Sequence, residues 1–273
     1  MSFIENLNRK VIFLILIIII GLPLVYPFPI SVPISSHTQN YYNVINSLAP
    51  GSSVLFVCAV ETKDSEMYPL TVATLIQLKE RKAVVITYNF FQGSETGLIP
   101  VFKAAGYDNL IYGTDYVHLG FVPGEESALS SFLLDMVGTR PRDYAGNPTA
   151  TMPIFQKVHT IQDIVLVIGS GSGTPGADAV AKVVVVPYNK LAIGAVSAGQ
   201  ASGMYQFIQL GIYKGALLGQ RSTVEYESLI GHAGYATSLF APLYLSHVVI
   251  IIIIMSANAS LWYRLWKEKG GKK

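Results

Sequence analysis

The sequence predicts an α/β protein: a three-layer, Rossmann-like domain with a mostly parallel sheet, flanked by two transmembrane helices. Three observations support this prediction. Only 13% of the 273 residues are charged, against roughly 25% in soluble domains. The apolar excess lies in two segments without Asp, Glu, Lys or Arg, residues 11–28 and 239–261. Between these segments, short apolar runs alternate with stretches of helical periodicity.

Each of the two uncharged segments is long enough to cross a bilayer as a helix. A span needs about 20 consecutive apolar residues, and residues 11–28 and 239–261 come close to that length. A cleavable signal peptide is the alternative for the first segment, but no small-x-small cleavage site follows it. We therefore expect two retained transmembrane helices in the lipid bilayer.

Basic residues flank both segments on their outer sides and set the expected orientation. Arg9 and Lys10 precede the first segment, and the tail 262–273 contains five Lys or Arg residues. Positive residues next to a span stay in the cytoplasm, so residues 1–10 and the tail are predicted to be cytoplasmic. Residues 29–238 then form an extracytoplasmic domain of a two-pass cell-membrane protein. The net charge of +2 belongs mostly to these flanks, so no nucleic-acid partner is expected.

Five apolar runs in the middle of the chain are predicted to be strands. They are continuous instead of alternating with polar residues, as in strands that helices cover on both faces of a parallel sheet. Helical patterns separate them, in the β-α-β order of such a sheet. The predicted strands are residues 53–60, 83–88, 109–112, 164–168 and 191–196. The predicted helices are residues 37–48, 66–81, 97–105, 125–136, 177–184 and 203–218, and residues 135–160 form an irregular excursion.

Six segments, in order, carry a resemblance to known proteins. They are YGTDYVHLGFVPG (112–124), DYAGNP (143–148), SGTPG (172–176), GIYKGALLG (211–219), VEYESLIG (224–231) and SLFAPLYLSHVVIIIIIMSANAS (238–260). Together they resemble an uncharacterised family of bacterial and archaeal membrane-anchored proteins with a Rossmann-like extracytoplasmic domain. The chain departs from the family pattern at residues 206–210, QFIQL. The resemblance implies an architecture and no activity.

A glycine-rich loop in the second half of the chain has the spacing of a dinucleotide-binding turn. Gly171, Gly173 and Gly176 form G-x-G-x-x-G between a predicted strand and a predicted helix, where a pyrophosphate binds in such folds. Three points oppose this interpretation: the motif follows a late strand, no acidic residue comes about 20 residues later, and the loop is expected outside the cell. We therefore predict no nicotinamide nucleotide and no cofactor. Ser172 and Thr174 remain candidates for binding another polar ligand.

Polar residues follow several of the predicted strands and define a candidate cleft. The carboxyl ends of parallel strands meet at one edge of a sheet, where α/β proteins bind ligands. Ordinary hydration of surface loops is the alternative explanation. The predicted ligand-binding residues are Glu61, Glu66, Ser94, Asp115, Ser172, Thr174 and Ser197.

The sequence contains no recognisable catalytic or metal-binding motif. It has no G-x-S-x-G elbow, and its five histidines lack metal-ligand spacing. Cys58 ends an apolar run, which favours a buried structural thiol. His118 lies among apolar residues and is expected in the core. His247, inside the second membrane segment, is either functional or a partner in a helix–helix hydrogen bond.

These observations favour a non-enzymatic, membrane-anchored protein that forms homo-oligomers or part of a membrane complex. Small residues at 256–260 permit close helix packing in a bilayer, and a tyrosine-rich domain with few charges suits surfaces that neighbours bury. The alternative is an extracytoplasmic ligand-binding receptor or hydrolase that uses the cleft at the carboxyl edge of the sheet.

Overall fold

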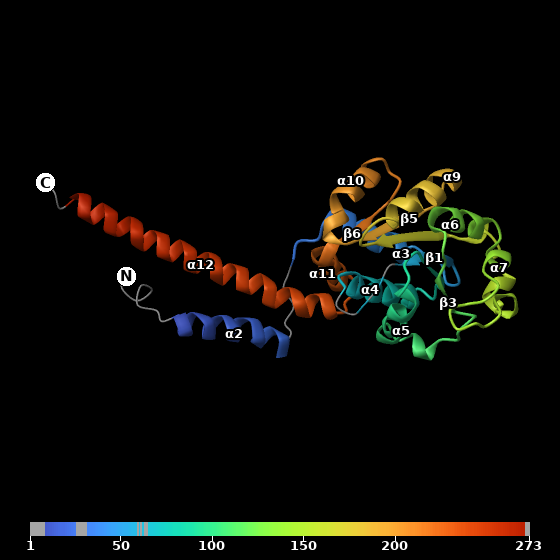
Figure 1. The fold of residues 1–273 in the computed structure, drawn as a ribbon, viewed down its shortest axis with the longest axis horizontal. Helices are drawn as coiled ribbons and strands as arrows, with labels where there is room; N and C mark the ends of the chain where they lie inside the picture. The colour runs from blue at the N-terminus through green and yellow to red at the C-terminus, as the bar shows by residue number, and fades with distance from the viewer. Residues whose placement is uncertain (1–8, 26–31, 59, 61, 63–64, 271–273) are drawn as a thin grey trace. The chain divides into compact units, whose positions relative to one another are not determined.

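The computed structural model describes residues 9–25, 32–58, 60, 62 and 65–270 (Figure 1). The chain divides into two compact units. Residues 32–236 form an α/β domain, and residues 1–31 together with 237–273 form a helical unit.

A parallel sheet forms the centre of the domain. In the described part of the chain it has six strands in the order β3-β2-β1-β4-β5-β6, and every pairing is parallel. The predicted α/β fold with a parallel sheet is therefore confirmed. The strands are β1 (Ser53–Cys58), β2 (Val84–Asn89), β3 (Tyr116–Phe121), β4 (Leu166–Gly171), β5 (Ala192–Val196) and β6 (Ala216–Leu218).

Both faces of the sheet are buried under helices, which explains the continuous apolar runs. Every residue of β1 and of β4 is buried. Alternate residues of β1 point to opposite faces: Leu55 and Val57 belong to one apolar cluster, and Val54 and Phe56 belong to the other. Each fully buried apolar side chain of this size stabilises the fold by about 1.5–3 kcal/mol.

Two layers of helices enclose the sheet (Figure 1). One layer supplies side chains to the same cluster as Val54 and Phe56; it contains α3 (Ser36–Asn46), α4 (Met67–Glu80), α5 (Ser94–Ala104) and α11 (Gly219–Leu229). The other layer packs against the Leu55 and Val57 side; it contains α6 (Glu125–Leu134), α7 (Met136–Thr139), α8 (Ala177–Val180), a π-helical turn (Ala181–Val185), α9 (Val186–Tyr188) and α10 (Ala201–Gln209).

Two elements differ from the sequence-based expectation. The third strand lies at Tyr116–Phe121 instead of 109–112, where Tyr107–Asn109 forms a 3-10 turn. The helix expected to run to residue 218 ends at Gln209. Gly211 follows with a φ of +69°, a left-handed conformation that ends helices, and β6 then occupies three residues. A strand this short has no detectable periodicity.

Side chains and loops cover both edges of the sheet. At the β3 edge, the amide of Tyr144 donates to the carbonyl oxygen of His118 at 3.1 Å, and the Arg140 guanidinium donates to that of Leu119. At the opposite edge, Nδ1 of His37 donates to the carbonyl oxygen of Ala216 in β6 at 3.0 Å.

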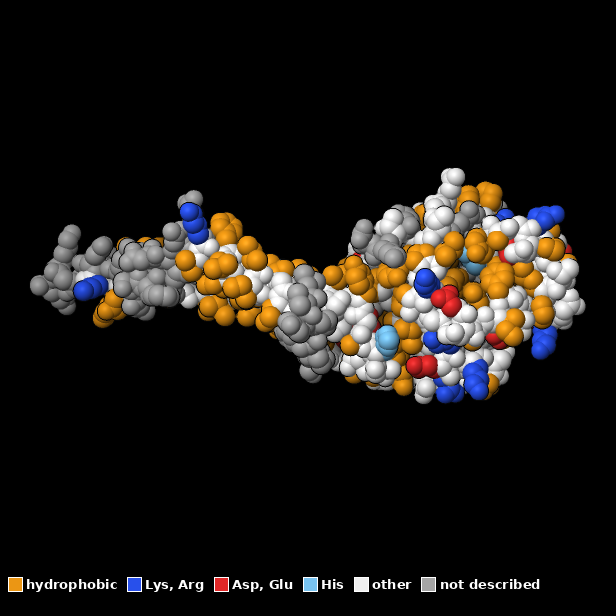
Figure 2. Space-filling view, turned by 90° about the horizontal axis from the view of Figure 1, so that it is seen from below, with side chains coloured by type: hydrophobic (Ala, Val, Ile, Leu, Met, Phe, Trp, Pro, Cys, Tyr) orange, Lys and Arg blue, Asp and Glu red, His pale blue; other side chains and the backbone are white. Residues whose placement is uncertain are grey.

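The helical unit contains a long apolar helix. α12 (Tyr235–Gly270) contains an 18-residue window with a mean hydropathy of 2.3, within residues 235–267. Among the described residues it is the one helix long and apolar enough to cross a membrane. α2 (Arg9–Val25) is apolar but has 17 residues, and residues 26–28 of the first predicted span lie outside the described residues. Two spanning helices were expected, and one helix of the described residues has the required length and hydropathy. Hydrophobic side chains cover much of the helical unit in Figure 2.

Candidate functional site

The glycine-rich loop lies at the point where the strand order of the sheet reverses. β4, which precedes this loop, pairs directly with β1, although 107 residues separate the end of β1 from the start of β4. In open α/β sheets, ligands bind outside the carboxyl ends of the strands at this point. The motif does follow a late strand, as expected, but this strand is central in the sheet.

The three glycines of the motif have different structural roles. A Cβ on Gly176 would lie 2.6 Å from the carbonyl oxygen of Gly173, and one on Gly171 would lie 3.0 Å from the Cα of Gly176. These two glycines allow the loop to close on itself. A Cβ on Gly173 would meet nothing within 4 Å. The middle glycine thus faces open space, at the wall of a pocket.

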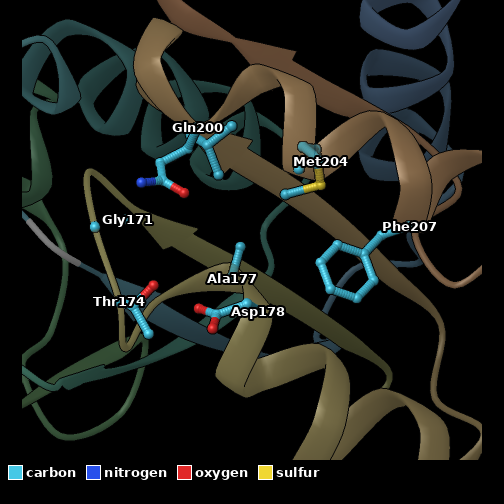
Figure 3. A pocket seen from close by; sticks show the side chains of 10 residues that line it. Gly171, Thr174, Ala177, Asp178, Gln200, Met204 and Phe207 are labelled. Carbon is cyan, nitrogen blue, oxygen red and sulfur yellow. The ribbon is translucent and has the colours of Figure 1, made fainter.

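The pocket lies between this loop and α10, and we call it the glycine-loop pocket. Its volume is about 90 Å³, enough to hold several water molecules. Thr174 and Asp178 lie on one side, and Gln200, Met204 and Phe207 lie on the other (Figure 3). Polar and apolar side chains therefore face each other across a small space.

Backbone amides of the glycine-rich loop lack hydrogen-bond acceptors. Among the described residues, the amides of Gly173 and Thr174, which line the pocket, and of Ser172, which does not, donate no hydrogen bond. The carboxylate of Asp178 accepts from the amide of Gly176 at 3.0 Å and contacts Nζ of Lys182 at 3.4 Å. Amide donors beside a carboxylate suit a ligand that both accepts and donates hydrogen bonds, such as a hydroxyl or a carboxamide. A phosphate would meet the negative charge of Asp178.

Two of the predicted ligand-binding residues meet near this pocket. Both oxygens of Glu66 are engaged by backbone amides, Oε1 by Gln220 at 2.7 Å and Oε2 by Ala198 at 3.0 Å. Ser197 precedes Ala198, and its amide donates to the carbonyl oxygen of Gly171 at 3.3 Å. Glu66 therefore joins three segments of the domain at the carboxyl edge.

The remaining predicted residues have different surroundings. Ser172 is exposed in the loop. Ser94, after β2, is fully buried, and its Oγ has no hydrogen-bond partner among the described residues. Glu61 lies outside the described residues.

The placement of Asp115 at the carboxyl edge is incorrect. Because the third strand begins at Tyr116, Asp115 precedes it and lies at the amino edge of the sheet. Its Oδ2 accepts a hydrogen bond from the amide of Ile111 at 2.8 Å. It also lines a cavity of about 320 Å³ at that edge, together with Lys157 and Asp163.

Sequence patterns missed three residues that line the glycine-loop pocket. Asp178 could have been identified from the sequence, because it is a polar residue in the first helical turn, two residues after Gly176. Met204 and Phe207 had no distinguishing signal, because apolar residues on a helix normally face the core.

The buried thiol and the core histidine have the surroundings expected for structural groups. Cys58 is fully buried, and this burial raises the pKa of its thiol. His118 is also buried; its Nδ1 lies 3.0 Å from Oγ1 of Thr87 and accepts from the amide of Gly120 at 3.3 Å. Across the described residues, no three His, Cys, Asp or Glu side chains are grouped as metal ligands.

Comparison of the chain with protein-family models, curated proteins and solved structures finds no match, so the geometry of this site is the basis on which a function is proposed.

Proposed function

We propose that the protein is a membrane-anchored receptor whose α/β domain binds a small hydroxyl- or amide-bearing ligand in the glycine-loop pocket. The observation that supports this most directly is that the amides of two pocket-lining residues, Gly173 and Thr174, donate no hydrogen bond among the described residues, beside the reversal point of the strand order. Unpaired amides at a pocket gain a hydrogen bond when a ligand displaces poorly ordered water.

The size and charge of the pocket define the class of ligand. About 90 Å³ lies well below the roughly 300–1,000 Å³ of pockets that hold drug-sized molecules. A ligand of a few heavy atoms, or one end of a larger molecule, fits this space. Asp178 favours a neutral group over a phosphate, and Met204 and Phe207 provide an apolar wall for its carbon atoms.

The membrane anchor is part of the same proposal. The uncharged length of α12 supports one span, and α2 is about 25 Å long at 1.5 Å per residue, near the roughly 30 Å of a hydrocarbon core. Arg9, Lys10 and the basic tail favour cytoplasmic termini and an extracytoplasmic domain. We propose a two-pass arrangement on this basis.

A second proposal is assembly into a homo-oligomer or a membrane complex through α12. Ala257 and Ala259 are exposed on this helix, and small residues permit close contact between helices in a bilayer. In mild detergent, Ala257→Leu combined with Ala259→Leu should then dissociate the oligomer without unfolding the domain. A wild-type protein that stays monomeric at all concentrations would contradict this assembly.

Ligand binding is tested on the full chain in maltoside detergent. Saturation-transfer NMR with glycerol, erythritol and acetamide as probes should show contact in the wild type. Gly173→Val should abolish this contact without changing the thermal unfolding temperature, because its side chain enters open pocket space. Equal signals from wild type and Gly173→Val, or no signal from any of the probes with the wild type, would exclude this pocket as the site.

A further inference from the structure

A second cavity lies beside the outer edge strand, away from the glycine-loop pocket. It has a volume of about 210 Å³ and is lined largely by aromatic rings. Strand β3 supplies Tyr116 and His118, and the segments before and after it supply Tyr112 and Tyr144. Ile99 and Phe102 of α5 and Asp108 of the 3-10 turn Tyr107–Asn109 complete the wall. The cavity is part of the α/β domain alone.

Tyr112 stands at a large angle to each of two neighbouring rings of the cavity. The ring centroids of Tyr112 and Tyr116 are 5.2 Å apart with an interplanar angle of 88°, and those of Tyr112 and Tyr144 are 6.4 Å apart at 76°. The ring centroids of Phe102 and Tyr116 are 4.9 Å apart, with an interplanar angle of 39°. Aromatic rings from four segments of the chain thus line one volume. We call this arrangement the aromatic box.

Hydrogen bonds hold two walls of the box in place without a ligand. The hydroxyl of Tyr112 donates to Oδ2 of Asp143 at 2.7 Å. The amide of Tyr144 donates to the carbonyl oxygen of His118, and the rings of these two residues are 4.6 Å apart. Rigid walls reduce the entropy that binding would cost. The box is therefore preorganised.

The charges around the box favour a cation. Among the described lining residues, one is charged, the exposed Asp108. Behind Tyr112, the Asp143 carboxylate also accepts from the amides of Ala145 and Asn147. A phenol that donates to a carboxylate gains electron density in its ring, which strengthens attraction to a cation on the ring face.

The cavity is a hollow of the domain surface. About 210 Å³ is open beside these rings. Tyr144 is still 38% exposed, so the space is accessible from solvent. Aromatic walls, an adjacent carboxylate and access from outside are the features of sites that recognise quaternary ammonium groups.

We propose that the aromatic box binds a quaternary or methylated ammonium group, with Tyr112, Tyr116 and Tyr144 as its cation–π walls and Asp108 as its counter-charge. Water solvates such a cation weakly compared with a primary ammonium, because its methyl groups prevent hydrogen bonding. The rings therefore replace its hydration at low cost. This site is distinct from the glycine-loop pocket in residues and in ligand class.

The test is calorimetric titration of choline into the full chain in maltoside detergent. The control ligand is 3,3-dimethylbutan-1-ol, which has the shape of choline and no charge. Choline should bind, and the neutral alcohol should bind about five- to thirtyfold more weakly, the range that one to two kcal/mol of cation–π attraction corresponds to. Equal binding of the two ligands, or no heat from choline up to about 10 mM, would overturn the proposal.

Substitutions of residues that line the aromatic box test whether choline binds there. Tyr144→Leu removes a half-exposed wall and should weaken choline binding about five- to thirtyfold, while Tyr144→Phe keeps the ring and should bind within about twofold of wild type. Asp108→Asn should weaken choline more than the neutral alcohol. Gly173→Val, in the other pocket, should leave choline binding unchanged. Unchanged binding in Tyr144→Leu, with an unfolding temperature like that of wild type, would place choline elsewhere.

Discussion

The carboxylate of Glu66 accepts a 2.7 Å hydrogen bond from the backbone amide of Gln220, a residue 154 positions later in the chain. Its second oxygen accepts from Ala198 at 3.0 Å. The start of α4, the connection from β5 to α10 and the start of α11 therefore meet at one side chain. Gly219 has a φ of +74°, and a Cβ there would lie 2.8 Å from Oε1 of Glu66. This contact fixes the carboxyl edge on which the glycine-loop pocket is built.

Removing this carboxylate should destabilise the domain. Glu66→Ala leaves two amides without their acceptor, and hydrogen bonds to charged groups contribute about 1.5–3 kcal/mol. Because Glu66 is partly exposed, water can reach these amides and we expect a loss of about 1–3 kcal/mol. Glu66→Gln keeps one acceptor oxygen and should lose less. Thermal unfolding of the wild type and the two variants measures these losses of stability. Equal stability of all three proteins would contradict the proposed role of the Glu66 hydrogen bonds.

The glycine loop should respond differently at two of its glycines. Gly176→Ala places a Cβ 2.6 Å from the carbonyl oxygen of Gly173, and overpacking of this kind costs about 1–3 kcal/mol. For a chain of this size, that lowers the unfolding temperature by a few degrees per kcal/mol. Gly173→Ala meets no atom and should unfold at the wild-type temperature. A larger effect at Gly173 than at Gly176 would refute the described loop geometry.

Nucleotides should not stabilise the protein. A ligand at a hundredfold excess over its dissociation constant adds about 2.7 kcal/mol to the free energy of unfolding, which a thermal scan detects easily. We expect no shift with NAD, NADP or ATP, because the pocket is small and Asp178 lies in its wall. A shift of several degrees that disappears in Gly173→Val would establish a nucleotide site.

Acid should weaken the loop that supports the aromatic box. Burial acts to raise the pKa of Asp143, but hydrogen bonds from Asn147, Tyr112 and Ala145 outweigh it, so its pKa lies below the usual value. A lowered pKa stabilises the fold above the unfolded-state value of about 3.9, and this contribution is lost as the pH falls through the folded pKa. The difference in unfolding temperature between wild type and Asp143→Asn should be constant from pH 7 to about pH 5. Below about pH 4 it should shrink, and a constant difference down to pH 2 would contradict this role.

The proposed topology is testable in intact cells. An external protease should cut within residues 141–153, an exposed irregular segment in part, while a tag placed after Lys273 stays protected. The basic residues on the cytoplasmic side are the physical reason. Cleavage of the tag together with protection of the segment would reverse the orientation.

Sequence patterns identified strands correctly where burial alone determines the residue types of a segment. β1 and β4 are buried on both faces, so their apolar runs identified them. β3 was missed because its run includes His118, whose polar ring the fold satisfies through Thr87. Periodicity is local, and it carries no information on which strands pair.

The candidate sites depended most on this missing information. Strand order decides that the loop after β4 lies beside β1, and the position of β3 decides that Asp115 lies at the amino edge. The aromatic box combines Tyr112 with Tyr144, which are 32 residues apart and meet because Tyr144 binds the edge of β3. Such a contact follows from tertiary packing and leaves no pattern in the residues around either tyrosine.

The covered edges of the sheet have a consequence if the protein is anchored in a membrane as proposed. An exposed edge strand is a template for strand addition by a neighbouring molecule, and this route leads to aggregation. Here Tyr144 binds the outer carbonyl of His118, and His37 binds that of Ala216. A neighbour would have to displace these donors before its own strand could pair. Neighbouring copies are therefore expected to associate through reversible side-chain contacts. Pairing of edge strands into a continuous intermolecular sheet is disfavoured.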